Sequence, residues 1–247
     1  SRQMEMQAFP LGSLLAGIKE GMYMKAYERE TGMWNKIFEE YQPLDLRGTE
    51  LKAEPMFDEA LMEFSDKTNR ILDFGCGTGD ISFQYLQYRP DHHVVGVDKA
   101  QKGIDFAKKT AELSHYRNAR FFIGGEEFPD QFEDGEFDGI IVSNVLDVMP
   151  KDISGKTMQK LTRLLKHEGY WFIKMNPYYS REELNALGYE KKGANLYEEG
   201  GVLHLRQATT EYWKKQLSKF GEILIYLEFQ YPWQEGMNRL FVIQKTD

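Results

Sequence analysis

The chain has 247 residues, and its 39 acidic against 31 basic residues give a formal net charge of −8. A single cysteine, Cys76, excludes an intramolecular disulfide framework and indicates a reducing, cytoplasmic setting. The longest apolar stretch, residues 139–149, is much shorter than the roughly 20 residues that cross a bilayer. Because the acidic balance also argues against a nucleic-acid backbone, we expect a monomer or homodimer with neither a membrane nor a nucleic-acid partner.

Residues 1–69 are predicted to form a helical N-terminal extension that covers the mouth of the sheet that follows. Apolar residues at helical spacing mark three segments of it. These are Leu11 to Met22, the stripe of Trp34, Ile37, Phe38 and Tyr41, and residues 55–67. Such stripes are typical of core packing, and the alternative is that rings such as Trp34, Tyr27 and Tyr41 form the wall of a binding pocket.

From residue 70 onward, strand patterns alternate with helix patterns. Five short runs rich in Ile, Val and other apolar residues have the length of strands buried on both faces. They are Arg70–Phe74, His93–Asp98, Arg120–Ile123, Phe137–Ser143 and Gly169–Met175. The alternation predicts an α/β domain over residues 70–247, with an open, mostly parallel sheet and helices on both of its faces.

The last third of the chain has a different pattern, and residues 176–208 are predicted to be an insertion. Within it, Val202–Gln207 alternates at period two, which is typical of a strand. Thr209 or Thr210 is then expected to cap the N-terminus of a helix. Two further strands are predicted to pair as an antiparallel hairpin at the edge of the sheet: Glu222–Phe229 and Arg239–Lys245.

The most informative segment is ILDFGCGTGD, residues 71–80, in which a predicted strand runs into a helix through three glycines. Gly75, Gly77 and Gly79 permit positive φ angles and let a ligand approach the backbone closely. A helix that begins directly after such a turn directs its free N–H groups at the ligand. The segment therefore predicts a ligand site at the carboxyl end of the first strand.

Carboxylates around this loop indicate which ligand it binds. A dinucleotide fold has the spacing G-x-G-x-x-G, whereas here Asp80 occupies the place of the third glycine and Asp73 precedes the first. Two carboxylates repel a pyrophosphate and suit a ligand with a positive charge. Asp98, at the end of the second strand, is placed to accept hydrogen bonds from ribose hydroxyls. A nucleoside with a cationic tail is therefore favoured over NAD.

Five segments in order resemble the motifs of the class I S-adenosylmethionine (SAM)-dependent methyltransferases. They are LDFGCGTGD, VVGVDKA, FIGGEEFP, FDGIIVSNVLDVMP and LLKHEGYWFI. The resemblance implies a seven-stranded, Rossmann-like sheet in the order 3-2-1-4-5-7-6 with strand seven antiparallel, and SAM as cofactor with S-adenosylhomocysteine as product. It implies cofactor contacts by Asp73, Gly75, Cys76, Gly77, Gly79, Asp98, Lys99, Glu126 (through adenine) and Asn144.

The methyl acceptor is expected to be a small molecule with an oxygen or nitrogen nucleophile, since no basic, aromatic-interleaved patch for RNA is present. His204, Tyr178 and Asp147 are the candidate catalytic residues, in that order, because a proton must leave such a nucleophile. Three further residues are candidates for binding the acceptor: Arg206, as the partner of a carboxylate, Tyr179 and Trp34. The adjacent pair at His92 and His93 points to opposite faces of a strand, so no metal site is expected.

Three alternatives remain at this point. An RNA or protein methyltransferase uses the same cofactor domain. Asn176-Pro177-Tyr178-Tyr179 is similar to the N-P-P-Y box of amino-methylating DNA enzymes but follows the fifth strand, whereas that box follows the fourth. An NAD-dependent oxidoreductase is disfavoured by the glycine spacing. A SAM-binding scaffold without catalysis would keep cofactor binding and transfer no methyl group.

Overall fold

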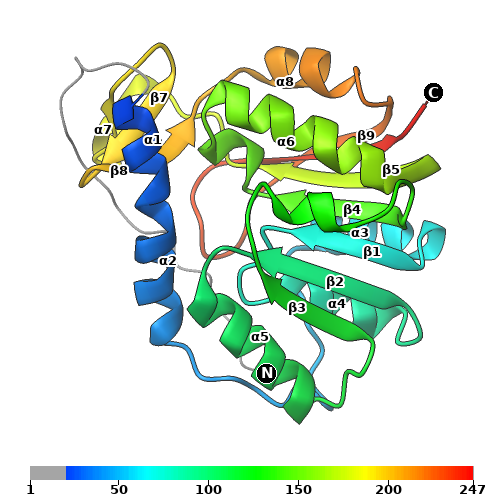
Figure 1. Ribbon diagram of the computed structural model, residues 1–247. Helices are drawn as coiled ribbons and strands as arrows, with labels where there is room; N and C mark the ends of the chain where they lie inside the picture. The colour runs from blue at the N-terminus through cyan, green and yellow to red at the C-terminus, as the bar shows by residue number, and fades with distance from the viewer. Residues whose placement is uncertain (1–20, 247) are drawn as a thin grey trace.

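A seven-stranded sheet forms the centre of the computed structural model, which describes residues 21–246 (Figure 1). The strand order is β3-β2-β1-β4-β5-β10-β9, in which β10 is antiparallel to both neighbours and the other pairs are parallel. The strands are β1 Arg70–Phe74, β2 His93–Asp98, β3 Ala119–Ile123, β4 Phe137–Ser143, β5 Leu165–Met175, β9 Glu222–Phe229 and β10 Asn238–Gln244. The predicted fold class, strand order and closing hairpin are thereby confirmed.

Helices cover both faces of the sheet because alternate strand residues are apolar on each side. Leu72 and Ile140 face the core under α6 and α8, whereas Ile71 and Ile141 face α3 and α4. α5 packs on Phe121 of the β3 edge. The helices are α3 Pro55–Lys67, α4 Asp80–Tyr88, α5 Gln101–Leu113, α6 Lys151–Leu164 and α8 Thr210–Leu217. Two large apolar interfaces therefore hold the sheet rigid beneath its carboxyl edge.

Local sequence signals fix where several helices begin. The Glu54 carboxylate accepts hydrogen bonds from the backbone N–H groups of Met56 and Phe57, and Pro55 occupies the first helical position of α3. The Thr209 side chain caps α8 by accepting a hydrogen bond from the N–H of Tyr212. Of the two residues predicted as alternative caps, Thr209 is therefore the one that is confirmed. These caps satisfy backbone donors that have no partner within a helix.

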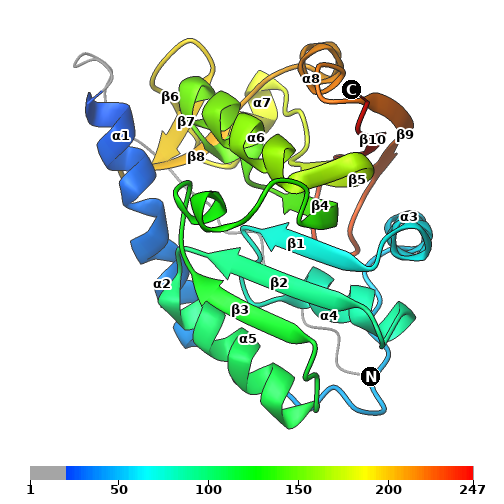
Figure 2. The same cartoon turned by 45° about the vertical axis from the view of Figure 1, so that its right-hand side comes forward.

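The carboxyl ends of β1, β2 and β3 point toward two short helices, α1 (Gly21–Glu28) and α2 (Glu30–Glu39), which stand across them (Figure 2). The predicted helical pattern from Leu11 to Met22 overlaps α1 only at its end, and residues 1–20 lie outside the described part of the chain. α2 contacts α5. The helix pair therefore covers the edge of the sheet at which open α/β folds bind ligands.

The chain between β5 and α8 forms a small unit of its own beside this helix pair. It contains α7 and a three-stranded antiparallel sheet in the order β6-β7-β8. The bounds are α7 Arg181–Ala186, β6 Glu190–Lys191, β7 Leu196–Glu199 and β8 Val202–Arg206. β8 contacts α1 and α2 and also the short 3₁₀ turn η2, Leu146–Val148, that follows β4. The region that the sequence predicts as an insertion thus extends the wall beside the covered edge.

Candidate active site

A cavity of about 300 Å³ lies between the carboxyl edge of the sheet and the α1–α2 pair. Its sheet side is formed by the ends of β1, β2 and β4 and the glycine loop. Its opposite wall comes from the N-terminal helices. That wall consists of Tyr27, Glu30, Thr31, Trp34, Ile37, Phe38 and Tyr41. The aromatic stripe favoured above as core packing is therefore a pocket wall, because no residue of α2 is fully buried and its apolar face meets the cavity.

The glycine loop has the backbone geometry that the sequence predicts. The φ angles of Gly75, Gly77 and Gly79 are +77°, +54° and +84°, a region that side chains strongly disfavour. A Cβ atom at Gly75 would come within 2.4 Å of the Val145 side chain. Gly75 and Gly77 line the cavity with Cys76, whereas Gly79 does not line it and instead precedes α4 as its N-cap.

Asp98 fixes this loop from the end of β2. Its two carboxylate oxygens accept hydrogen bonds, each 2.8 Å long, from the backbone N–H groups of Gly77 and Ala100. Burial raises the pKa of Asp98, and these hydrogen bonds oppose the rise. The carboxylate lines the cavity with unused lone pairs, so it can accept further hydrogen bonds from a ligand.

Two more carboxylates line the same side. Asp73 accepts a 2.6 Å hydrogen bond from Ser82, and burial raises its pKa to about 7, with smaller contributions from Asp98 and Asp80. Burial likewise raises the pKa of Asp80, against a hydrogen bond from Thr78. Three acids that resist ionisation in one cavity would be stabilised in their charged form by a cationic ligand.

A contact of three residues closes one end of the cavity. The Lys99 Nζ lies 2.7 Å from Glu126 and 2.9 Å from the Tyr27 hydroxyl, which also donates to Glu126. Burial and the Glu126 carboxylate raise the pKa of Tyr27. For Glu126 itself, burial raises the pKa, but the hydrogen bonds from Lys99 and Tyr27 outweigh this effect and the pKa of Glu126 is lowered. Glu126 does not line the cavity, so the predicted contact between Glu126 and adenine is corrected. The reason is that its carboxylate is already bound to Tyr27 of α1.

Sequence reasoning missed Glu30, the carboxylate that α2 contributes to the cavity. Its oxygen accepts a 3.2 Å hydrogen bond from the Trp34 indole, whose ring stacks on Phe38. Burial raises the pKa of Glu30 to about 8, against the effect of the Trp34 hydrogen bond and of Lys99. Its spacing of four residues from Trp34 on one helix face is the only local signal for this pair.

Comparison with known proteins decides the family. A family model described as a methyltransferase domain matches residues 65–221, more than half of the chain. The chain belongs to the class I SAM-dependent methyltransferase family. The residues present fit SAM, since the loop admits a ligand against its backbone and four carboxylates face the cavity.

Relatives of this methyltransferase agree over the cofactor region. It is 29% identical over 116 residues to an uncharacterised methyltransferase of Schizosaccharomyces pombe, and 34% identical over 106 residues to the release factor glutamine methyltransferase of Aliivibrio fischeri. These matches cover 44% and 41% of this chain, and 41% and 37% of the two relatives. The chain thus spans less than half of the length of these curated relatives.

Solved structures share the fold of this chain. The 1,6-didemethyltoxoflavin-N1-methyltransferase of Burkholderia thailandensis superimposes with a TM-score of 0.60 at 17% identity, over 96% of this chain and 94% of that one. A Pyrococcus horikoshii protein gives 0.63 at 19% identity, over 93% and 100% of the two chains. At this identity the likeness establishes the fold alone.

The three predicted catalytic residues lie outside the cavity lining. His204 stacks on Tyr189, and burial lowers its pKa to about 4, so its ring is neutral near pH 7. Tyr178 is 52% exposed on the surface. Asp147 is fully buried, and its carboxylate accepts hydrogen bonds from the backbone and side chain of Asn176. The structure does not bring these three groups together with the glycine loop.

Two of the three predicted acceptor-binding residues are also placed elsewhere. Arg206 is 2% exposed, and its guanidinium donates to the carbonyls of Met149 and Leu146, so it is not available to an acceptor carboxylate. It supports the turn after β4 and does not line the cavity, contrary to the expectation for it. Tyr179 packs against Tyr189. Trp34 does line the cavity, as does Asn144, whose backbone is left-handed with φ +55°.

No cluster of three or more His, Cys, Asp or Glu residues suited to a metal ion occurs within residues 21–246. Within the same range, no helix is both long and apolar enough to cross a membrane.

Proposed function

We propose that this methyltransferase transfers the methyl group of SAM to an oxygen or nitrogen atom of a small-molecule acceptor inside the cavity. One observation carries the proposal: the glycine loop, Asp98 and the aromatic rings of α2 face one another across a single covered space. When bound, SAM supplies a methyl group on a sulfonium that leaves as a neutral thioether. The protein therefore has no departing anion to stabilise, and its task is alignment.

The residues of the sheet edge are suited to hold the cofactor. Asp98 would accept hydrogen bonds from the ribose hydroxyls. Asp73 would face the ammonium group of the amino-acid end, and the backbone at Gly75 and Gly77 allows the closest approach. Lys99, Gly124 and Gly125 line the cavity together, and we assign the adenine to that end.

The α1–α2 pair would exclude water and align the acceptor. Bringing two reactants into a near-attack geometry is worth about 7–11 kcal/mol, and the covered position of the cavity serves this purpose. We assign proton removal to Glu30, which faces the cavity, in place of His204, which does not. The pKa of Glu30, about 8, is close to neutral pH, as a general base requires. Trp34 orients that carboxylate through its indole N–H.

A small acceptor is favoured over a macromolecule by the size and cover of the cavity. About 300 Å³ is at the lower end of small-molecule sites and must also hold SAM, so the space that is left suits a small acceptor, and α1 and α2 stand across the glycine loop. Asn176 and Pro177 follow β5 and not β4, so they do not form the amide-binding box of amino-methylating enzymes. The Burkholderia thailandensis structure, which holds 1,6-didemethyltoxoflavin and S-adenosylhomocysteine, supports this preference.

Calorimetric titration with S-adenosylhomocysteine, with NAD as the control ligand, tests the proposal. We expect micromolar binding of the first ligand alone and its loss in Asp98→Ala. A panel of phenols, amines and N-heterocycles with labelled SAM would then identify the acceptor class by transfer of label. Binding of NAD in place of S-adenosylhomocysteine would refute the cofactor assignment, and labelling of protein or RNA alone would refute the small acceptor.

A further inference from the structure

Lys174, near the end of β5, is a buried cation that forms no ion pair with a described carboxylate, although the charge of Asp147 acts on it. It is 1% exposed, and no carboxylate within residues 21–246 forms an ion pair with it. Its Nζ instead lies 2.9 Å from Oδ1 of Asn144, 3.3 Å from Oδ1 of Asn238 and 5.1 Å from the centre of the Tyr231 ring. Because burying an ammonium group is costly, this arrangement calls for a reason beyond packing.

The lysine determines how the amide of Asn144 is oriented. An ammonium group only donates hydrogen bonds, so it must face the amide oxygen and not the amide nitrogen. The nitrogen, Nδ2, makes no hydrogen bond to any residue that the structure describes, and Asn144 lines the cavity. The backbone N–H of Asn144 also donates to the carbonyl of Lys174, at 2.9 Å. Both contacts hold Asn144 as a hydrogen-bond donor toward the ligand.

We propose that Lys174 is a positioning residue, which fixes Asn144 so that its Nδ2 donates to the carboxylate at the amino-acid end of the cofactor. This inference rests on the proposed function, which assigns that end to Asp73. β4 is the neighbour of β1, so Asn144 follows the strand end beside Asp73. Lys99, the cation of the cavity lining, is already bound to Glu126. At this end the lining offers two side-chain donors, the Asn144 amide and the Ser143 hydroxyl, and Lys174 contacts the first of them.

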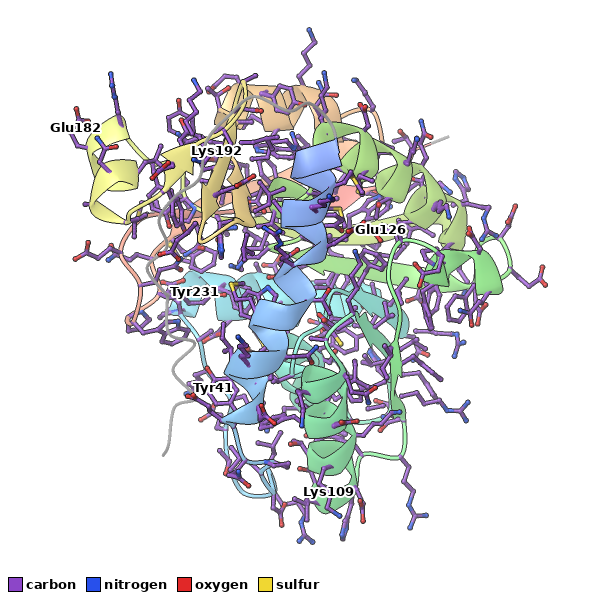
Figure 3. All side chains as sticks on the ribbon, turned by 60° about the vertical axis from the view of Figure 1, so that its left-hand side comes forward. Tyr41, Lys109, Glu126, Glu182, Lys192 and Tyr231 are labelled. Carbon is purple, nitrogen blue, oxygen red and sulfur yellow. The ribbon has the colours of Figure 1, made fainter. Side chains whose placement is uncertain are left out.

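Lys174 and Lys99 act on different parts of the cavity. In Figure 3, Tyr231, whose ring lies beside Lys174, is to the left of the α1–α2 helices, and Glu126, which binds Lys99, is to their right. The positive charge below Asn144 therefore acts on one end of an extended ligand and not on both. A carboxylate at that end gains both the Nδ2 hydrogen bond and the field of the buried ammonium.

Two probes isolate this contact: SAM and decarboxylated SAM, which lacks only the carboxylate. For the wild-type protein we expect SAM to bind about 10- to 100-fold more tightly in calorimetric titrations, the range for a hydrogen bond to a charged group. Asn144→Asp keeps the oxygen that faces Lys174 but replaces the donor with a second acceptor. Its preference for SAM should vanish or reverse, while binding of decarboxylated SAM is kept.

Lys174→Met tests the positioning role itself. Without the ammonium group the amide can turn over, so we expect the preference for SAM to shrink about tenfold. Asn69→Asp, an exposed position at the other end of β1, is the matched control for the added charge and should keep the wild-type preference. Thermal unfolding of all variants verifies that they are folded.

The outcomes separate this inference from the proposed function. If the wild-type protein binds neither probe, the cofactor assignment fails and the inference with it. If the wild-type protein binds SAM but Asn144→Asp and Lys174→Met retain its full preference over decarboxylated SAM, only the role of Lys174 and Asn144 is overturned. A loss of affinity for both probes alike would also overturn it, because a structural disturbance does not distinguish the carboxylate.

Discussion

Replacing Lys174 with methionine should change how the stability of the protein depends on pH. Burial lowers the pKa of Lys174 from 10.5 to about 8, with Asp147 opposing the change. Between these two values the unfolded chain still holds the proton and the folded chain has released it. The unfolded state then binds more protons, so wild-type stability rises with pH over this window. Below pH 8 the cost of the buried charge is fully present.

The structure sets the size of this effect. A difference of about 2.5 pH units corresponds to about 3 kcal/mol at about 1.36 kcal/mol per unit, and the side chain is too buried for solvent screening to reduce it much. Methionine has no charge to desolvate, but it loses the hydrogen bonds to Asn144 and Asn238, worth roughly 1 kcal/mol each. Lys174→Met should therefore be about 1 kcal/mol more stable than the wild type at pH 7 and less stable near pH 10.5.

Urea unfolding of both proteins at several pH values between 7 and 10.5 measures this. The free energy of unfolding of Lys174→Met, minus that of the wild type, should fall by about 3 kcal/mol across the range. Lys109→Met, on the exposed side of α5, is the control for losing a lysine elsewhere. A difference that stays constant with pH would show that Lys174 is not desolvated in the folded protein and would refute the reasoning.

Three further changes test other parts of the site. Gly75→Ala places a Cβ atom 2.4 Å from the Val145 side chain at φ +77°, so a loss of at least about 2 kcal/mol in urea unfolding and of S-adenosylhomocysteine binding is expected; an unaltered protein would contradict the loop geometry. Arg206→Ala leaves two buried carbonyls without donors and should cost about 3 kcal/mol by thermal unfolding; a change in ligand affinity alone would restore its predicted binding role. Tyr27→Phe removes the hydroxyl between Lys99 and Glu126, so amide hydrogen exchange in α1 should quicken about tenfold, and unchanged protection would show that this contact does not hold the helix.

Much of the fold could be predicted because its signals are local. The strands β1, β2 and β4 lie on the predicted residues, since runs such as Ile140 to Val142 are apolar on both faces and fit a buried parallel strand. The glycine loop is equally local, because positive φ at three positions is a property of the chain itself. Asp98 followed from its distance in sequence to that loop.

Side-chain roles that depend on distant segments could not be predicted in the same way. Period two places Arg206 correctly on one face of β8, but only the docking of the insertion against η2 turns that face toward the carbonyls of Leu146 and Met149. Similarly, the spacing of Trp34 and Phe38 fits a core helix and a pocket wall equally well. Which of the two roles these rings have depends on how α2 packs against the sheet.

The sequence by itself determined the strands and the cofactor loop, because strand patterns and turn geometry follow from contiguous residues, and the order of the strands followed from the resemblance to a family. Only the tertiary structure decided which groups face the cavity. Glu30 reaches it from 43 residues before Asp73, and Lys174 meets Asn144 from 30 residues away, through packing that no local pattern records. Distances between such groups are set by how α2 and β5 pack against the rest, and chemistry at the site depends on those distances.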